Sequence, residues 1–183
     1  MRKANDNYPT PHTIIDTLLQ QLGWDIRDCW EPCAGDGRFA DAIDAAFGVS
    51  TVRHDIVMGQ DFFLWDKAQA STLITNPPFK QIRLFIDHAF SIGVKRMALV
   101  CPERLWACKV GLQQYERHRP SRFVNLSWRE DYLQRGKGHS PDRALAISIW
   151  DRPHSNQCSY EVWGKHIHGI QAVQHVQHVD VGS

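Results

Sequence analysis

The chain has 183 residues, of which 43% are hydrophobic and 22% are charged, and its formal net charge is +1. This length suits one α/β domain, and the composition is that of a globular protein rather than of a disordered or fibrous chain. The longest apolar stretches are interrupted by charges within about ten residues, which excludes a membrane span of about 20 residues. The polar start of the chain lacks the apolar core of a signal peptide, so we expect a cytoplasmic location.

The first part of the chain alternates between amphipathic helices and short strands. After an extended segment at Tyr8–Pro11, apolar residues recur at helical spacing from Ile14 to Leu22. We predict a strand over Asp25–Trp30, a glycine-rich turn at Ala34–Gly37 and a helix from Phe39 to Gly48. A strand, a glycine turn and a helix in this order open a βαβ unit.

The rest of the chain continues this alternation and ends in strands with no helix between them. The expected strands cover residues 49–53, 72–75, 97–100, 123–128, 144–150 and 160–163, and the expected helices cover residues 82–92 and 105–115. This order predicts a mostly parallel seven-stranded sheet with helices on both faces, a terminal antiparallel hairpin, and ligands at the carboxyl ends of the strands. We expect one domain over residues 1–165, a mobile tail over residues 166–183 and no separate target-recognition domain.

The cysteines and histidines show no pattern typical of a metal site. The five cysteines include no CxxC pair, so we expect reduced thiols. Four histidines crowd the tail without cysteines or carboxylates at zinc spacing, namely His166, His168, His175 and His178. We therefore predict no bound metal.

The glycine-rich turn after the first predicted strand is flanked by acids. Gly35 and Gly37 allow the backbone to approach a ligand closely. Glu31 stands before the turn, and Asp55 stands at the end of the second predicted strand. An acid placed like Asp55 can accept hydrogen bonds from both ribose hydroxyls, so these residues predict a site for a nucleoside cofactor.

The tetrapeptide Asn76-Pro77-Pro78-Phe79 ends the third predicted strand. Its two prolines fix the backbone, so the Asn76 side chain and the Pro77 carbonyl point in preset directions. An exocyclic amine is a poor nucleophile because its lone pair is delocalised into its ring. Two acceptors on its N–H groups favour the geometry that frees the lone pair, and Phe79 offers a face on which a base can stack, worth about 1–3 kcal/mol.

These motifs resemble the N6-adenine DNA methyltransferases, which are Rossmann-like class I amino-methyltransferases, and most of all their small phage and prophage members. The shared elements are Tyr-x-Thr-Pro, Glu-Pro-x-Ala-Gly-Asp-Gly and Asn-Pro-Pro-Phe, in this order. The motifs cover about residues 8–100, and the strand order extends the resemblance to about residue 152. Many relatives have Asp-x-Phe/Gly-x-Gly-x-Gly where this chain has Glu31-Pro32-Cys33-Ala34-Gly35, a departure that bears on the subfamily.

The resemblance implies S-adenosylmethionine as the cofactor and a role for each matched residue. The implied cofactor contacts, from the methionine part to the adenine, are Tyr8, Thr10, Pro11, Glu31, Ala34, Gly35, Gly37, Asp55, Asp61 and Phe62. The first three would lie over the methionine part, and the next four would contact its amino acid end. Asp55 would hold the ribose, Asp61 would accept from the adenine amino group, and Phe62 would pack on that ring. Asn76, Pro77 and Phe79 would hold the target base.

A positively charged middle region indicates a polyanionic substrate. Residues 95–143 carry 11 Lys and Arg against 5 Asp and Glu. The candidate nucleic-acid contacts are Lys80, Arg129, Arg135, Lys137 and Arg143. A base inside a duplex cannot reach such a pocket, so we expect a flipped or unpaired adenine in DNA. The short loop between residues 129 and 143 indicates low specificity or a short recognition site.

Four alternatives remain open on the sequence alone. The same tetrapeptide occurs in enzymes that methylate N6 of adenine in structured RNA, and a similar one, usually with Tyr, occurs in enzymes that methylate glutamine in proteins. Methylation of cytosine N4 is chemically close, although those enzymes usually have Ser in the position of Asn76. A catalytically inactive module that keeps the fold would bind the cofactor without turnover.

Overall fold

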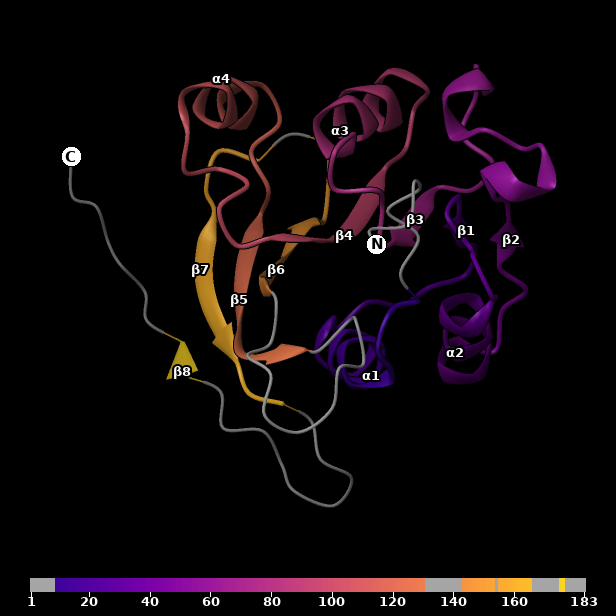
Figure 1. Ribbon diagram of the computed structural model, residues 1–183, viewed down its shortest axis with the longest axis horizontal. Coiled ribbons are helices and arrows are strands. Elements are labelled where there is room, and N and C mark those ends of the chain that lie inside the picture. The colour runs from indigo at the N-terminus through magenta and orange to yellow at the C-terminus, as the bar shows by residue number, and fades with distance from the viewer. Residues whose placement is uncertain (1–8, 131–142, 154, 166–174, 177–183) are drawn as a thin grey trace, which may run out of the picture.

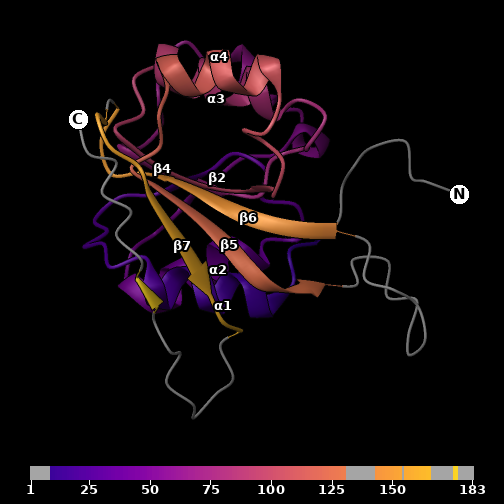
Figure 2. The ribbon, with the colours of Figure 1, turned by 90° about the vertical axis from the view of Figure 1, so that its left-hand side faces the viewer.

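The computed structural model describes residues 9–130, 143–153, 155–165 and 175–176 and shows one sheet between two layers of helices (Figure 1). α1 (His12–Gln21) and α2 (Arg38–Phe47) cover one face, and α3 (Ile82–Ser91) and α4 (Lys109–Arg117) cover the other (Figure 2). The strands are β1 (Trp30–Glu31), β2 (Val52–Arg53), β3 (Thr72–Thr75), β4 (Arg96–Pro102), β5 (Arg122–Glu130), β6 (Arg143–Trp150), β7 (Ser159–Trp163) and β8 (His175–Val176). Within the described ranges, no helix is long and apolar enough to cross a membrane.

The sheet has the strand order β2-β1-β3-β4-β6-β5-β7-β8. The pairings among β2, β1, β3 and β4 are parallel, whereas β6 pairs antiparallel with both β4 and β5. The predicted parallel region and the predicted antiparallel hairpin, β5 with β6, are therefore confirmed. β7 pairs parallel with β5, and β8 adds a two-residue eighth strand that the sequence did not predict, inside the segment expected to be a tail.

The order of the strands reverses between β1 and β3. The chain runs from β1 outward to its neighbour β2 and then returns to β3 on the other side of β1. In such a sheet the loops after the two central strands diverge and leave a crevice at the carboxyl ends. Glu31 ends β1 and Asn76 follows β3, so the topology brings the two motifs to this crevice.

Alternate residues of the central strands fill two separate apolar cores. Leu73 of β3 and Leu99 of β4 pack with the apolar side of α3, whereas Ile74 and Ala98 pack with α1 and α2. All four side chains are completely buried. A strand covered on both faces is apolar along its whole length, which explains the continuous apolar run at residues 97–100.

Three elements, β1, β2 and α4, begin later than predicted, and side chains form turns before β1 and α4. Asp28 accepts hydrogen bonds from the hydroxyl and the backbone N–H of Ser71, the latter at 2.9 Å, so the segment before β1 is a loop tied to the start of β3. α4 starts at Lys109 because the Cys108 thiol caps it, accepting from the Gly111 N–H at 3.3 Å. Both corrections concern polar side chains that compete with regular structure.

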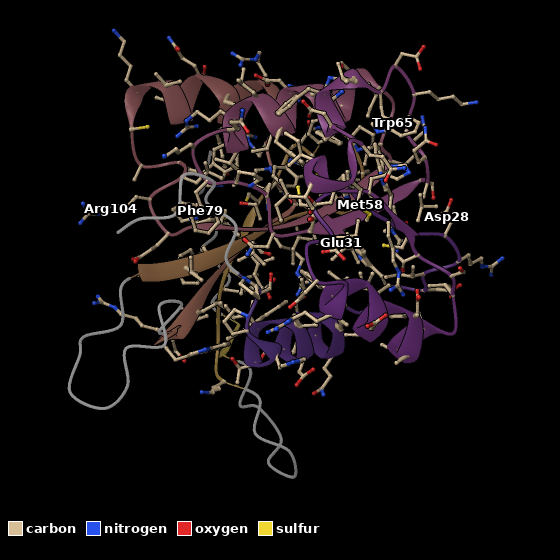
Figure 3. The ribbon with its side chains drawn as sticks, turned by 45° about the vertical axis from the view of Figure 1, so that its right-hand side comes forward. Asp28, Glu31, Met58, Trp65, Phe79 and Arg104 are labelled. Carbon is tan, nitrogen blue, oxygen red and sulfur yellow. The ribbon has the colours of Figure 1, made fainter. Side chains whose placement is uncertain are left out.

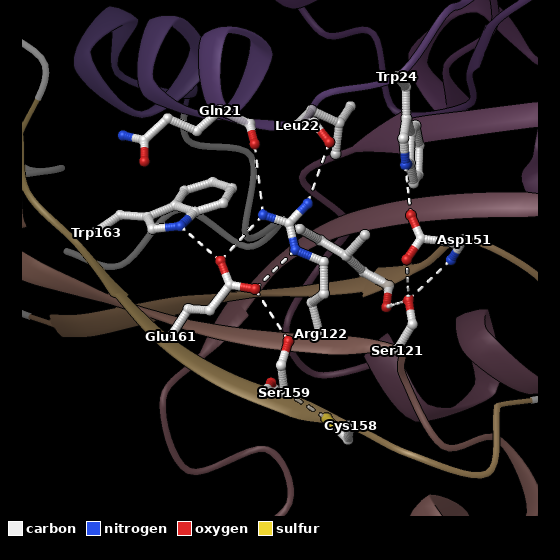
Figure 4. A network of polar contacts seen from close by, with 11 residues as sticks. Gln21, Leu22, Trp24, Ser121, Arg122, Asp151, Cys158, Ser159, Glu161 and Trp163 are labelled. Atoms are coloured by element: carbon white, nitrogen blue, oxygen red, sulfur yellow. Dashed lines mark hydrogen bonds and ion pairs between the residues drawn. The ribbon is translucent and has the colours of Figure 1, made fainter. Parts of the chain in front are cut away.

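An ion pair connects β7 to β5 and to the end of α1 (Figure 4). Arg122 contacts Glu161 at 2.8 and 3.0 Å, and its guanidinium also donates to the Leu22 carbonyl at 3.1 Å. A positive charge at a helix C-terminus is favourable. Burial raises the pKa of Glu161, but hydrogen bonds from Arg122 and from the neighbouring donors outweigh it and hold the pKa below its usual value.

Candidate active site

A cavity of about 520 Å³ opens at the carboxyl ends of β1 and β3, where the strand order reverses. Its walls come from the segment before α1, the β1–α2 loop, the segment after β2 and the loop after β3. The residues predicted from the sequence that line it are Thr10, Glu31, Ala34, Gly35, Asp55, Asp61, Phe62, Asn76 and Lys80. Residues from four distant segments of the chain therefore meet in one cavity.

Glu31 is a buried carboxylate in the wall of this cavity (Figure 3). Its side chain is 2% exposed, and its Oε2 atom has no hydrogen-bond partner among the described residues. Burial raises the pKa of Glu31 to about 8, against smaller opposing effects of the Ala40 N–H and Arg53. A cation that reaches this carboxylate would favour its ionised form and satisfy the buried oxygen.

The loop between β1 and α2 is held open by glycines and by Asp55. Gly35 and Gly37 have φ angles of +55° and +85°, in the left-handed region that favours glycine. The Asp55 carboxylate accepts from the Gly35 N–H at 2.7 Å and from the Val57 N–H at 2.9 Å. These bonds fix the orientation of the carboxylate, and each oxygen keeps a lone pair for a ligand hydroxyl.

Two short 3₁₀ helices, η1 (Ile56–Met58) and η2 (Phe62–Leu64), carry Asp61 and Phe62 to the cavity. Asp61 caps η2 by accepting from the Phe63 N–H at 3.0 Å. Phe62 is buried and stacks on Phe85 of α3 with ring centroids 3.9 Å apart. The two predicted residues are therefore in the cavity wall, with the Phe62 ring fixed from behind.

Asn76 presents an acceptor that the protein itself does not use. Its Nδ2 donates to the Thr10 hydroxyl at 3.0 Å, so the segment before α1 is tied to the end of β3. Its Oδ1 is buried and has no hydrogen-bond partner among the described residues. Thr10 is buried too, and both Thr10 and Asn76 line the cavity, so this bond fixes the orientation of the amide in the cavity wall.

Other predicted residues do not line the cavity. Pro11, Gly37, Pro77 and Phe79 belong to the segments that form the walls but are not in the lining. Phe79 is half-buried and packs against the core that contains α1. Arg129 and Arg143 lie in β5 and β6 outside the lining. Tyr8, Arg135 and Lys137 lie outside the described residues, as do His166, His168 and His178.

Some wall residues were not predicted. Ile56 and Val57 follow Asp55, are 64% and 65% exposed, and line the cavity with Phe63, Arg38 and Gln81. An apolar pair directly after the strand-end acid was the available signal for the first two. Among the described residues no cluster of histidine, cysteine and acidic side chains could hold a metal.

His54 has a structural position beside the site. Its Nδ1 accepts from the Trp30 indole N–H at 3.1 Å, and its ring stacks on Trp65 with centroids 4.5 Å apart. Burial lowers the pKa of His54. His54 is therefore part of the aromatic packing beside the cavity.

The architecture is that of the Rossmann-like class I S-adenosylmethionine-dependent methyltransferases. No protein-family profile and no curated protein sequence matches the chain. Similar solved structures include the methyltransferase subunit of a type I restriction-modification system from Streptococcus thermophilus, with 12% identity over 88% of this chain and 48% of that one and a TM-score of 0.59. The M protein of the type I restriction enzyme EcoKI has 12% identity over 90% of this chain and 49% of that one and a TM-score of 0.53.

A third similar structure comes from Listeria monocytogenes and carries the description class I S-adenosylmethionine-dependent methyltransferase. It has 9% identity over 87% of this chain and 67% of that one, with a TM-score of 0.58. This chain spans about half the length of the two type I subunits. At these identities the comparisons establish the fold.

Proposed function

We propose that the protein transfers a methyl group from S-adenosylmethionine to the exocyclic N6 amine of adenine in DNA. The observation that carries this proposal concerns two residues of the cavity lining, Asn76 and Glu31: Asn76 Oδ1 and Glu31 Oε2 are buried and have no hydrogen-bond partner among the described residues. The Asn76 oxygen suits an N–H donor, and the Glu31 carboxylate suits a cation.

The cavity fits the charge and shape of S-adenosylmethionine. The cofactor carries a positive sulfonium and a positive ammonium, and Glu31, Asp55 and Asp61 make its proposed site acidic. Glu31 would hold the ammonium, Asp55 the ribose hydroxyls and Asp61 the adenine amino group, while Gly35 provides a close backbone approach. When bound, the cofactor supplies an electrophilic methyl group.

The residues after β3 would hold the target amine. Asn76 Oδ1 accepts one N–H of the amine, and the Pro77 carbonyl, to which no hydrogen bond is formed within the described residues, accepts the other. Both acceptors are fixed before the substrate arrives, so they stabilise the pyramidal amine without reorganisation. Phe79 is the proposed stacking surface for the base because it is an aromatic residue of the motif and is only half-buried.

The proposed reaction needs no dedicated base. The nitrogen becomes acidic once it carries the methyl group, so its proton can pass to water. His54, the histidine nearest to Asp55 in the sequence, is engaged by Trp30 and Trp65 and does not line the cavity. The role of the protein in the proposed reaction is therefore to hold and orient the amine.

The proposal of DNA as substrate is supported by the similar structures and by the excess of Lys and Arg in residues 95–143. Two of those structures are named as parts of type I restriction-modification systems. A flipped or unpaired adenine would enter the site, and the proposal includes low sequence specificity. The proposal also keeps the small phage-type subfamily and a cytoplasmic location.

The direct test is transfer of tritiated methyl from S-adenosylmethionine to unmethylated duplex DNA, single-stranded DNA and total RNA in parallel, followed by nucleoside analysis. We expect N6-methyladenine in DNA. Label confined to RNA, or to N4 of cytosine, would contradict the proposed substrate. Tight cofactor binding with no label in any arm would show an inactive module.

A further inference from the structure

The charge around the cavity is unevenly distributed. Its lining contains four carboxylates, Glu31, Asp36, Asp55 and Asp61, and the Arg38 side chain in the same lining is paired with Asp36 at 2.7 Å. The cofactor side of the cavity is therefore acidic. A nucleic-acid backbone is repelled from this side, so it must leave the cavity in another direction.

Exposed cations occur on the other side of the cavity. Lys80 lies in the loop after β3, Arg104 lies just after β4, and Arg129 lies near the end of β5. Figure 3 shows Phe79 between Glu31 and Arg104, so Arg104 lies beyond the motif on the side away from the buried acid. The acidic residues and the cations thus flank the proposed position of the target base.

The strand register places these cations at the same end of the sheet, where the carboxyl ends of β3, β4 and β5 lie. The Glu103 N–H donates to the Ala144 carbonyl at 3.3 Å, and Ala144 is paired with Arg129. Arg104 and Arg129 are therefore separated by β6 alone, which corresponds to two strand spacings, or about 10 Å. Glu103 is a carboxylate in the same turn, but it forms no ion pair with Arg104.

These cations have no acidic partner within the described part of the chain. Lys80, Arg104 and Arg129 are exposed, and none of them forms an ion pair with a described carboxylate. Elsewhere, five arginines pair with carboxylates, namely Arg27, Arg38, Arg53, Arg117 and Arg122. Cations without an internal partner are available for phosphate groups.

We infer that Lys80, Arg104 and Arg129 form a phosphate-binding track along the carboxyl ends of β3, β4 and β5, which carries the strand that contains the target base. The identity of the polyanion rests on the proposed function. Arg104 was not among the residues predicted from the sequence, because its neighbours in the track come from other strands. The track lets the base reach Asn76 while the phosphates stay away from the acidic cofactor side.

The test measures binding of a labelled, unmethylated single-stranded DNA by fluorescence anisotropy over a range of salt concentrations. The test variants are Arg104→Gln and Arg129→Gln. The matched control is Arg152→Gln. Arg152 is also exposed and also forms no ion pair with a described residue, but it follows β6 at the opposite end of the strands. Lys95→Gln is a second control, because Lys95 lies just before β4 at the same end of the strands as Arg152.

We expect each test variant to weaken DNA binding and to reduce the slope of log Kd against log salt by about 0.7, the value for one phosphate contact on a single strand. The controls should leave the slope unchanged, and calorimetry should show unchanged affinity for S-adenosylmethionine in all variants. Equal slopes for Arg104→Gln and Arg152→Gln would overturn the track.

The methyl-transfer assay separates this inference from the proposed function. DNA methylation by the wild-type protein, together with no effect of Arg104→Gln on binding or its salt dependence, would refute the track alone. Weaker DNA binding with a reduced salt slope in Arg104→Gln, together with no methylation of any nucleic acid by the wild-type protein, would support the track and refute the proposed function.

Discussion

At the scale of single residues, two buried acceptors define the cavity. Glu31 Oε2 and Asn76 Oδ1 have no partner within the described chain, and a buried polar atom of this kind costs about 1–3 kcal/mol of stability. Ligands that satisfy these atoms, the cofactor at Glu31 and the target base at Asn76, would recover that free energy on binding. Replacing either side chain with one that needs no such partner should therefore raise the stability of the protein and lower its function.

Glu31→Gln should stabilise the protein at alkaline pH. Since the pKa of Glu31 is raised to about 8 in the folded protein, the neutral acid is favoured by folding. Wild-type stability should consequently fall as the pH rises from the unfolded pKa of about 4.5 to about 8. A gain of even about 1 kcal/mol would raise the Tm by roughly 2–4 °C.

Thermal unfolding of both proteins at about pH 5 and about pH 9 checks this expectation. The Tm difference should be small at the acidic pH and should favour Glu31→Gln at the alkaline pH. The same variant should bind S-adenosylmethionine more weakly, since it lacks the charge for the ammonium. A variant less stable than wild type at both pH values would contradict the assignment.

Thr10 should act as a positioning residue for Asn76. Thr10→Val keeps the shape of the side chain but leaves the Asn76 Nδ2 without its acceptor, whereas Thr10→Ser keeps the hydroxyl. A net hydrogen bond of about 1 kcal/mol corresponds to roughly a fivefold loss of kcat for Thr10→Val. Steady-state kinetics should show most of the kcat retained in Thr10→Ser.

The resemblance to adenine methyltransferases instead implies that Thr10 contacts the methionine part of the cofactor. In that case Thr10→Val would raise the KM for S-adenosylmethionine and leave kcat unchanged. Measuring kcat and KM separately therefore distinguishes the two roles.

At the scale of elements, regular patterns were predictable and side-chain turns were not. The short runs at residues 72–75 and 97–100 and the helical periodicity at residues 82–92 are clear in the sequence, and β3, β4 and α3 appear there. β1 is two residues long because Asp28 holds Ser71, a contact between residues 43 positions apart. β8 has two residues, too few for any sequence pattern.

The candidate site was predictable as far as strand ends are concerned. Glu31 ends β1, and Asp55 and Asn76 come soon after the neighbouring strands β2 and β3. A reversal of strand order brings such positions together. The bond between Thr10 and Asn76 was not predictable, because it depends on how the segment before α1 crosses the sheet edge. The packing of Phe79 against the α1 core depends on the same tertiary arrangement.

The ion pair of β5 with β7 should stabilise the edge of the sheet. Glu161 and Arg122 are largely buried, with side chains 15% and 21% exposed, so Glu161→Gln should lower stability by about 1.5–3 kcal/mol at neutral pH. Because the folded pKa of Glu161 is lowered, this contribution is present above the unfolded pKa and disappears as the pH falls through the folded pKa.

Denaturant unfolding at neutral and acidic pH checks this prediction. Asp25→Asn is the matched control, since Asp25 and Arg27 form an ion pair whose side chains are 76% and 88% exposed. Such an exposed pair contributes little, about 0–1 kcal/mol. A destabilisation by Glu161→Gln that persists unchanged at acidic pH would contradict the electrostatic explanation.

At the scale of the whole molecule, the carboxyl ends of the strands combine an acidic cavity with a row of cations that form no ion pair with a described residue. The acidic residues come from the end of β1 and from the segments after β1 and β2. The cations lie after β3, after β4 and near the end of β5. This polarity suits a positively charged cofactor beside a polyanionic substrate. The positive middle region predicted from the sequence includes Arg104 and Arg129, which lie at this end of the strands.

The measurement that tests the central claim most directly compares Asn76→Ala with wild type in methyl transfer to DNA and in calorimetric binding of S-adenosylmethionine. Asn76→Asp serves as the control that keeps an acceptor. We predict that Asn76→Ala lowers kcat by about a hundredfold or more while the cofactor affinity stays near that of wild type. Comparable kcat values for Asn76→Ala and wild type would contradict the role of Asn76 as the acceptor for the target amine.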